Sequence, residues 1–268
     1  MARGKYGTVF SIGLQNTFVY RWNFLLKTLF SLIPLAATVF VWRAVFSEGG
    51  SDTHGYDFHG IVFYFLLTNL VDTLVTPTED EWQIAAEIRD GRISAFLTKP
   101  VDYLAYRLSL YASYRIVYTS VALLPLALLF WGFHDFLRMP QSSATWPIFL
   151  LSLSLSALIQ FLMAYLIAML AFWILEISTI VFLLYSFEYF LSGQVFPLDL
   201  LPDSFQGVIR WMPFTYEVFF PVQIFLERIQ GPLLWQGLAI QTLWAAILLT
   251  MARCAWNKGI RHYQAVGG

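Results

Sequence analysis

The sequence has few charged residues and a single cysteine, and both shortages exclude classes of protein. Only 12% of its 268 residues are charged, about half the share found in soluble domains. The lone Cys254 can form neither an intramolecular disulfide nor a cysteine-rich metal site. Sixteen Lys and Arg residues against seventeen Asp and Glu leave a formal net charge of -1. The chain therefore lacks the positive charge that is typical of nucleic-acid binding, and no nucleic-acid partner is expected.

Motifs of catalysis are also missing. The chain has no G-x-x-x-x-G-K-[ST] phosphate loop, so we do not expect it to hydrolyse ATP. H-E-x-x-H and G-x-S-x-G are absent, which leaves an intramembrane enzyme with little support. One polar stretch, SDTHGYDFH, does contain side chains that can bind metal, but their spacing matches no zinc pattern and a hydrated loop needs polar residues, so no metal is expected. These side chains are Asp52, His54, Asp57 and His59.

Long apolar runs dominate what is present. Hydrophobic residues make up 58% of the chain, and the mean hydropathy is +0.63. A bilayer core about 30 Å thick needs roughly 20 apolar residues in a helix. The run 146–196 is long enough for two helices, with the turn at Glu176, because Ser178 and Thr179 can cap a new helix. The sequence thus predicts an all-α membrane protein, a single transmembrane domain with six transmembrane helices. They are expected near residues 23–46, 58–76, 106–133, 146–175, 177–196 and 233–255.

The distribution of Lys and Arg predicts the orientation of the chain. With the amino terminus inside, most basic residues fall on the inner side, as is typical of cytoplasmic segments. Arg107 is counted there as a loop residue, whereas Arg43 and Arg115 fall within spans. An even number of spans then places both termini in the cytoplasm. No cleavable signal is expected, because the first apolar run begins after Trp22 and exceeds a signal-peptide core.

A short amphipathic segment precedes the first span, within residues 1–22. Tyr6, Phe10, Leu14 and Phe18 recur every four residues among polar ones. This pattern predicts an amphipathic surface helix at the amino terminus, lying along the inner side of the membrane. The alternative is a mere extension of the first span.

The connection 77–103 after the second span is too patterned for a simple loop. Apolar residues recur at near-helical spacing among charged ones, and Gly91 and Pro100 are helix stop signals. We predict a helix that ends near Gly91, followed by a second short helix or turn. Helices this short are marginal in water unless an apolar face is buried. That face could pack on the chain's own membrane domain or on a protein partner, and composition favours neither.

The connection 192–231 is too apolar for a solvated loop. Its prolines exclude one continuous helix, so we expect short broken helices that dip into the bilayer. Asp203 and Ser204 are candidate caps for one of them, over residues 205–211. Irregular backbone at membrane depth is tolerated only inside protein or along a cavity, which indicates a pathway or gate. An interfacial anchor of aromatic residues is the alternative.

Three charged residues lie in or near predicted spans. They are Asp72, Arg115 and Glu188. A charge at membrane depth is costly unless it is paired or hydrated. Arg115 could pair with Glu188 or Asp72, and Arg115 and Glu188 are candidates for a translocation path, with a structural ion pair as the alternative. The inverted repeats that would support a stand-alone carrier are not visible.

Both unusual connections resemble those of permease subunits of type-2 ABC exporters. Residues 87–102, EIRDGRISAFLTKPVD, are similar to an inner-loop motif in which a charged helix precedes a Gly, an apolar stretch and a Pro. Ser192-Gly193, Pro197-Leu198, Pro202 and Met212-Pro213-Phe214 are similar to the stretch before the last span. Six spans, internal termini and the chain length also fit this bacterial family, so the resemblance covers essentially the whole chain.

The resemblance implies a membrane subunit in the bacterial cytoplasmic membrane that exports an amphiphile such as a drug, lipid, glycan or peptide. It implies a pair of permeases, identical or homologous, each with a re-entrant outer hairpin between spans five and six. A separate dimer of ABC ATP-binding subunits would hold ATP and Mg, and residues 77–103 would supply the cytoplasmic coupling helix between spans two and three. The alternative is a stand-alone secondary transporter or channel that uses the intramembrane charges.

The resemblance also assigns roles to single residues of this chain. The coupling residues would be Glu81, Glu87, Arg89, Gly91 and Arg92. The outer gate would be shaped by Gly193, Pro197, Pro202 and Pro213.

Overall fold

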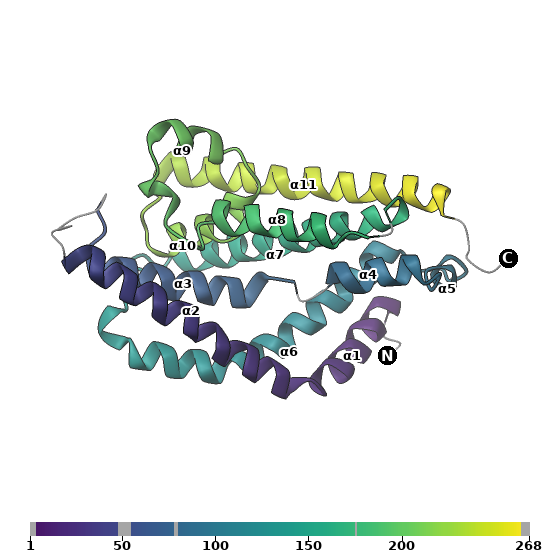
Figure 1. The fold of residues 1–268 in the computed structure, drawn as a ribbon, viewed down its shortest axis with the longest axis horizontal. Helices are drawn as coiled ribbons and strands as arrows, with labels where there is room; N and C mark the ends of the chain where they lie inside the picture. The colour runs from purple at the N-terminus through teal and green to yellow at the C-terminus, as the bar shows by residue number, and fades with distance from the viewer. Residues whose placement is uncertain (1–3, 48–54, 78–79, 175, 264–268) are drawn as a thin grey trace.

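The computed structural model describes residues 4–47, 55–77, 80–174 and 176–263, and these residues form helices and no strand. The long helices lie roughly side by side along the longest axis of the molecule (Figure 1). Five stretches are long and apolar enough to cross a membrane. They are built on α2 (Arg21–Ser47), α3 (Phe58–Val75), α6 (Tyr103–Gly132), α7 (Thr145–Met169) and α11 (Gly231–His262).

These five stretches agree with five of the six predicted spans. The largest difference among them is at α11, which continues past residue 255 to His262. The sixth apolar helix, α8 (Ser178–Leu191), has 14 residues, fewer than the roughly 20 that a bilayer requires. The expected span 177–196 is therefore too long as a helix, because the chain turns at Ser192 and Gly193.

α1 (Lys5–Phe18) begins and α11 ends at the same end of the molecule (Figure 1). α4 (Asp80–Arg89) and α5 (Ser94–Leu97) are at this end, whereas α9 (Asp203–Ile209) and α10 (Phe219–Phe225) are at the opposite one. A chain that begins and ends at one side of the molecule passes along it an even number of times, and α8 together with the five long stretches makes six passes. That α8 also crosses a membrane stays a prediction.

The predicted turn between α7 and α8 is confirmed, but its capping is different. A short helix, η2 (Leu170–Phe172), ends the fourth long stretch, and α8 begins at Ser178. Because Ser178 is already helical, its backbone N–H donates to Glu176 Oε1 at 2.9 Å. Glu176 therefore supplies the cap that was expected from Ser178 and Thr179. These hydrogen bonds from Ser178 lower the pKa of the exposed Glu176 carboxyl.

α7 lies at the centre of the core. It packs against α3, α4, α10 and α11, and its side chains Ile159, Phe161 and Tyr165 are fully buried. α2 packs on α3 and α6, and much of its surface is exposed and apolar, as expected of a helix that faces lipid.

The predicted amino-terminal helix is present as α1 (Lys5–Phe18), which packs along the first half of α6. Tyr6, Phe10 and Leu14 are partly buried, whereas Phe18 is exposed although the pattern placed it on the same face. Contacts with the start of α6 hold α1: Lys5 donates to the Pro100 carbonyl at 2.7 Å. Its placement along a membrane surface stays a prediction.

The polar stretch before α3 has structural roles where it is described. Asp57 caps α3 by accepting a hydrogen bond from Gly60 N at 2.9 Å, and it pairs with Arg138 at 2.6 Å. His59 stacks on Phe136, with ring centroids 4.8 Å apart. Asp52 and His54 lie outside the described residues. Within the described ranges, no three His, Cys, Asp or Glu side chains are grouped as metal ligands would be.

Candidate functional site

α4 and α5 form one compact unit, the α4–α5 element (residues 80–99). Gly91 joins the two helices with φ 75°, a left-handed conformation that glycine adopts at little cost. The N–H groups of Gly91 and Ile93 donate to the last carbonyls of α4, those of Ile88 at 3.3 Å and Glu87 at 3.1 Å. The predicted helix end near Gly91 and the second short helix are therefore confirmed.

The apolar face of the α4–α5 element is buried in its own domain. Ile84, Ala85, Ile88 and Ile93 are at most 3% exposed, and α4 packs against α7. Burying an isoleucine contributes about 1.5–3 kcal/mol, so this face fixes the element firmly. The opposite surface, at the end of the molecule (Figure 1), is charged and open. Its exposed residues are Asp90, Arg92, Ala95, Leu97, Thr98 and Lys99.

Glu87 points inward, toward α6. The Tyr103 hydroxyl donates to Glu87 Oε2 at 2.6 Å, and Arg107 forms an ion pair with the same oxygen at 2.5 Å. Arg107 Nε also donates to Tyr103 Oη at 3.0 Å, which closes a three-residue network. Arg107 is therefore buried in α6, and counting it as a loop charge was wrong. A displacement of α4 must act on α6 through this network.

A second set of contacts ties the same region to α11. Asp102 caps α6 by accepting from Ala105 N at 2.8 Å, and it is paired with Arg253 of α11. The Ser94 and Tyr263 hydroxyls lie 2.9 Å apart and share a hydrogen bond. The α4–α5 element and the residues just after it are thus connected to both α6 and α11.

The predicted coupling residues occupy different environments. Glu81 is only 4% exposed, and Glu87 is occupied by α6. Arg89 and Gly91 are half-buried, whereas Arg92 is exposed and pairs with Asp90 at 2.9 Å. Of the five, Arg92 is the most accessible, whereas Glu87 contacts Tyr103 and Arg107 of α6.

Arg115 lies at the point where α3 ends. The last carbonyls of a helix lack partners within the helix and carry partial negative charge. Arg115 donates to the Thr73 carbonyl at 2.8 Å, and the Tyr111 hydroxyl donates to the Val75 carbonyl. Asp72 lies within electrostatic reach of Arg115. These contacts give Arg115 a structural role at the end of α3, and its part in a translocation path stays a prediction.

Glu188 of α8 lies beside Glu217, an acidic residue that the sequence analysis did not single out. Glu217 follows the short helix η4 (Phe214–Tyr216) and is completely buried. Its carboxylate oxygens meet no N–H or hydroxyl donor among the described residues, and the Glu188 carboxyl lies close enough to share a hydrogen bond with the Glu217 carboxyl. Two carboxylates this close do not both ionise unless a cation is present. The structure thus brings together an acidic pair that is suited to holding a proton or a cation.

The 192–230 segment consists of short helices, as predicted, and a proline precedes three of them. The helices are η3 (Leu198–Leu200), α9, η4 and α10. Pro197, Pro202 and Pro213 each stand immediately before one of these helices, where the fixed φ of proline is compatible with a helix start. α9 begins at Asp203 itself and ends at Ile209, so the prediction of Asp203 and Ser204 as caps was wrong. The Pro202 carbonyl accepts the first hydrogen bonds instead.

Gly193 joins α8 to the 192–230 segment in a crowded position. Its φ is 83°, and its carbonyl accepts a 2.6 Å hydrogen bond from the Tyr64 hydroxyl of α3. A Cβ at this position would lie 2.7 Å from Tyr64 Oη and 3.0 Å from Phe219 Cβ. Only glycine fits here without a shift of its neighbours.

A family model described as ABC-2 family transporter protein matches residues 32–267. The chain belongs to the ABC-2 transporter family. No curated protein and no solved structure matches the chain significantly. Members of the ABC-2 family are membrane components of transporters, and the family in general associates with an ABC ATP-binding subunit. The resemblance inferred from the two connections is thereby confirmed at the level of the family.

Sequence reasoning on this ABC-2 family protein missed mainly the residues that contact the two connections from the long helices. Tyr103 and Arg107 are four apart, so they share one face of α6, which is a weak signal that was available. Arg253 could not be linked to Asp102 without the fold. Glu217 could have been found, because an acidic residue in a segment expected to enter the bilayer is a functional candidate by default.

Proposed function

We propose that this protein is the permease subunit of an ATP-driven exporter in the bacterial cytoplasmic membrane, with six crossings and both termini in the cytoplasm. It works as one of a pair of permeases with a dimer of ATP-binding subunits, which hold ATP and Mg. The exported substrate is an amphiphile. The observation that carries the proposal is the α4–α5 element, which combines an exposed charged tip with anchors on α6 and α11.

The anchors explain how a push on this element reaches the other end of the molecule. α11 has 32 residues and is about 48 Å long. It carries Arg253 near the α4–α5 element, and its first turns pack beside the 192–230 segment. Closure of an ATP-binding subunit would therefore move a rigid unit, and the short helices of the 192–230 segment would open or close as a gate.

The first experiment is to extract the complex in mild detergent, capture this chain and identify its partners by mass spectrometry. We expect a stoichiometric ATP-binding subunit. The double variant Arg92→Glu with Leu97→Asp, at the exposed tip, should lose it. Lys258→Glu, a charge reversal of an exposed residue on α11 near the same end, is the matched control and should keep it.

Glu87→Gln separates docking from transmission. Because Glu87 contacts α6 rather than the exposed tip, the variant should keep the ATP-binding subunit but lose most ATP-driven transport. If both variants moved solute in liposomes without any ATP-binding subunit, the coupling role would be wrong.

A stand-alone carrier is the second candidate, and the Glu188–Glu217 pair is the observation that favours it. A buried acidic pair is a typical proton or cation site in carriers. Under that hypothesis the wild-type chain alone would transport solute in liposomes along a proton gradient, and Glu217→Gln would abolish this activity. Transport that requires ATP and the partner subunit contradicts it.

A further inference from the structure

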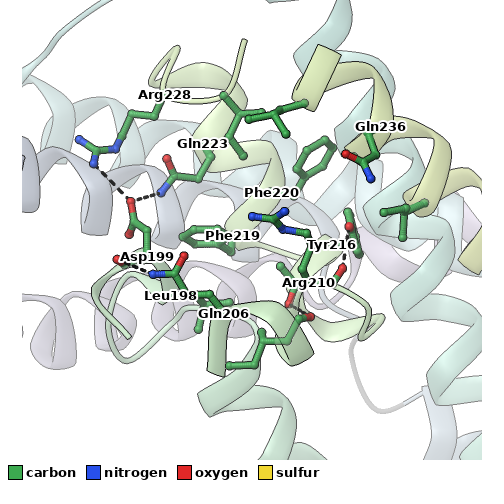
Figure 2. A pocket seen from close by; sticks show the side chains of 16 residues that line it. Leu198, Asp199, Gln206, Arg210, Tyr216, Phe219, Phe220, Gln223, Arg228 and Gln236 are labelled. Carbon is green, nitrogen blue, oxygen red and sulfur yellow. Dashed lines mark hydrogen bonds and ion pairs between the residues drawn. The ribbon is translucent and has the colours of Figure 1, made fainter. Parts of the chain in front are cut away.

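The 192–230 segment and the start of α11 enclose a cavity of about 250 Å³ (Figure 2). One part of its wall is polar and the other is apolar. The polar groups divide into those that already bond to each other and those that do not, and this division indicates what the cavity can bind.

The polar groups of one wall are satisfied within the protein. Asp199 accepts hydrogen bonds from the Tyr56 hydroxyl at 3.1 Å and from Gln223 at 3.4 Å, and it forms an ion pair with Arg228 at 3.3 Å. Gln206 donates to two backbone carbonyls of the same segment. The charges of Asp199 and Arg228 therefore cancel, and this wall is a built framework without spare charge.

Arg210 and Gln236 are different. In the part of the chain that the structure describes, no hydrogen bond or ion pair is recorded for the Arg210 guanidinium or for the Gln236 amide. Both line the cavity, and Figure 2 shows both side chains directed into it. The Arg210 backbone is fixed, because its carbonyl accepts a 2.8 Å hydrogen bond from the Tyr216 hydroxyl. The cavity thus presents one positive charge that has no ion-pair partner among the described residues, and one amide, both from residues that are exposed.

The apolar wall is rigid. Phe220 packs directly on the backbone of α11 at Gly237, where an added Cβ would lie 2.2 Å from Phe220 Cε2. Leu233 and Ile240 continue this wall along α11. Phe220 therefore gives the cavity that Arg210 lines an apolar surface of fixed position.

The surroundings of the cavity are suited to a membrane interface. Trp211 and Trp235 are about 60% exposed, at 59% and 63%, and Phe205 and Val208 on α9 are similarly exposed. Exposed tryptophans of membrane proteins gather at the level of the lipid head groups. A ligand could hence place a polar head in the cavity and an apolar tail among these side chains.

We propose that this cavity binds an amphiphile through an anionic head group, a phosphate or a carboxylate. The Arg210 guanidinium and the Gln236 amide hold the head group, and Phe220 with the exposed side chains around it contacts the apolar part. A guanidinium presents two parallel N–H donors that match the oxygens of phosphate and carboxylate. The proposal rests on the membrane placement of the chain and not on its coupling to an ATP-binding subunit.

The test uses the full chain in a neutral detergent, with binding measured by native mass spectrometry. The probes are dihexanoyl phosphatidic acid, dihexanoyl glycerol, which lacks the phosphate, and inorganic phosphate, which lacks the tails. We expect phosphatidic acid to bind at least tenfold more tightly than either comparison probe. If inorganic phosphate bound as tightly as phosphatidic acid, the proposed requirement for an apolar part would be wrong. If dihexanoyl glycerol bound as tightly, the proposed requirement for an anionic head group would be wrong.

Variants then assign the site. Arg210→Gln should weaken phosphatidic acid binding about tenfold, and Gln236→Leu about threefold. Arg138→Gln is the matched control, since Arg138 is an exposed arginine outside this cavity that pairs with Asp57, and its binding should be unchanged. If the Arg210→Gln variant does not fold, Arg210→Lys serves instead. It keeps the positive charge without the two parallel N–H donors, so its loss of phosphatidic acid affinity should be intermediate. Unchanged binding in a folded Arg210 variant would overturn the proposal.

A final arm identifies the source of the ligand. The complex is reconstituted with its ATP-binding partner in liposomes that contain a labelled short-chain phosphatidic acid. Movement of the label between leaflets on addition of ATP, lost in Arg210→Gln, identifies a transported substrate. Binding without movement identifies a resident lipid of the bilayer. Both results support the site, and the binding assay stands even if no ATP-binding partner is found.

Discussion

The two ends of the molecule are held together by different kinds of contact. At the end with the α4–α5 element, ion pairs join separate helices: Glu87 with Arg107 and Asp102 with Arg253. In the 192–230 segment, the contacts are mainly hydrogen bonds to backbone carbonyls, such as Tyr64 to Gly193. The first arrangement resists a shift of one helix against another, whereas the second joins short helices at turns. Under the proposed coupling role, an ATP-binding subunit would act on the rigid α4–α5 end. The resulting movement would take place at the turns of the 192–230 segment, the articulated end.

One buried residue of α11 connects the articulated end to the core. Gln241 donates to the carbonyls of Ser152 and Tyr216 at 3.0 Å each, and its Oε1 accepts from the Ser152 hydroxyl at 3.0 Å. Ser156 also donates to the Tyr216 carbonyl, at 2.8 Å. The 192–230 segment is thus fastened to α7 and α11 at η4, and the helices before that point are free of this constraint. Substitutions at these contacts test whether the two ends differ in this way.

The largest effect is expected at the rigid end. Arg107→Leu leaves Glu87 without its ion-pair partner inside the protein, which should lower the free energy of unfolding by about 3–5 kcal/mol. Chemical unfolding in neutral detergent, followed by tryptophan fluorescence, measures it. Arg92→Leu, which removes an exposed ion pair, is the control and should cost at most about 1 kcal/mol.

The double variant Arg107→Leu with Glu87→Leu sharpens this prediction. Because no charge is then left buried, much of the lost stability should return. If the double variant were as unstable as the sum of the two single ones, the ion pair would not be the contact that holds α4 to α6.

The next effect is expected at the fastening point. Gln241→Leu removes the hydrogen bonds to the Ser152 and Tyr216 carbonyls and leaves the buried Ser152 hydroxyl without its acceptor, which together should cost about 2–3 kcal/mol. Thr242→Val is the control: it removes only a hydroxyl that bonds within α11, and its cost should be below about 1 kcal/mol. Equal losses in both variants would mean that the Gln241 contacts do not fasten the segment.

A smaller effect is expected at the junction of α8. Gly193→Ala forces alanine into a positive φ and brings its Cβ against Tyr64 Oη, which should cost about 1–3 kcal/mol. Gly207→Ala, in α9, meets open space and should be neutral or slightly stabilising. Gly193→Ala should cost less in a Tyr64→Phe background than in the wild type, because the contact with Tyr64 Oη is then absent while the contact with Phe219 and the strained φ remain. A Gly193→Ala protein with wild-type stability would contradict a fixed junction.

The same junction shows what the sequence could not predict. The positions of the five long stretches follow from local composition, because each is a run of apolar residues long enough to span a bilayer. The run before Phe196 stays apolar past Leu191, and composition cannot register that Gly193 turns to bond Tyr64. The end of α8 was therefore misplaced because a tertiary contact, and not hydropathy, decides it.

The candidate site divides in the same way. Gly91 and Pro100 locate the α4–α5 element, since glycine and proline act on their own backbone. The direction of Glu87 could not be read, because a charged residue on an amphipathic helix faces either water or a buried partner, and only the packing of α4 against α6 and α7 decides between them. Sequence patterns thus located the two segments, and the fold was needed to assign their contacts.

The smallest effect is expected at Asp102, the helix cap that is also paired with Arg253. Against the opposing effect of its partial burial, the hydrogen bonds from Ala105 N–H and Arg253 lower the pKa of the Asp102 carboxyl. A carboxyl whose pKa is lower in the folded protein contributes stability that is complete above its unfolded pKa of about 3.9 and is lost as the pH falls through the folded value.

Asp102→Asn keeps the cap and removes the charge, so it should cost only about 0.5 kcal/mol for a pair this exposed, whereas Asp102→Ala should cost about 1 kcal/mol more. The difference between wild type and Asp102→Asn should stay constant from pH 7 to pH 5 and shrink below pH 4, as measured by unfolding at each pH. A difference that grew on acidification would mean that Arg253 is held by another group, and the tie between the start of α6 and α11 would then lie elsewhere.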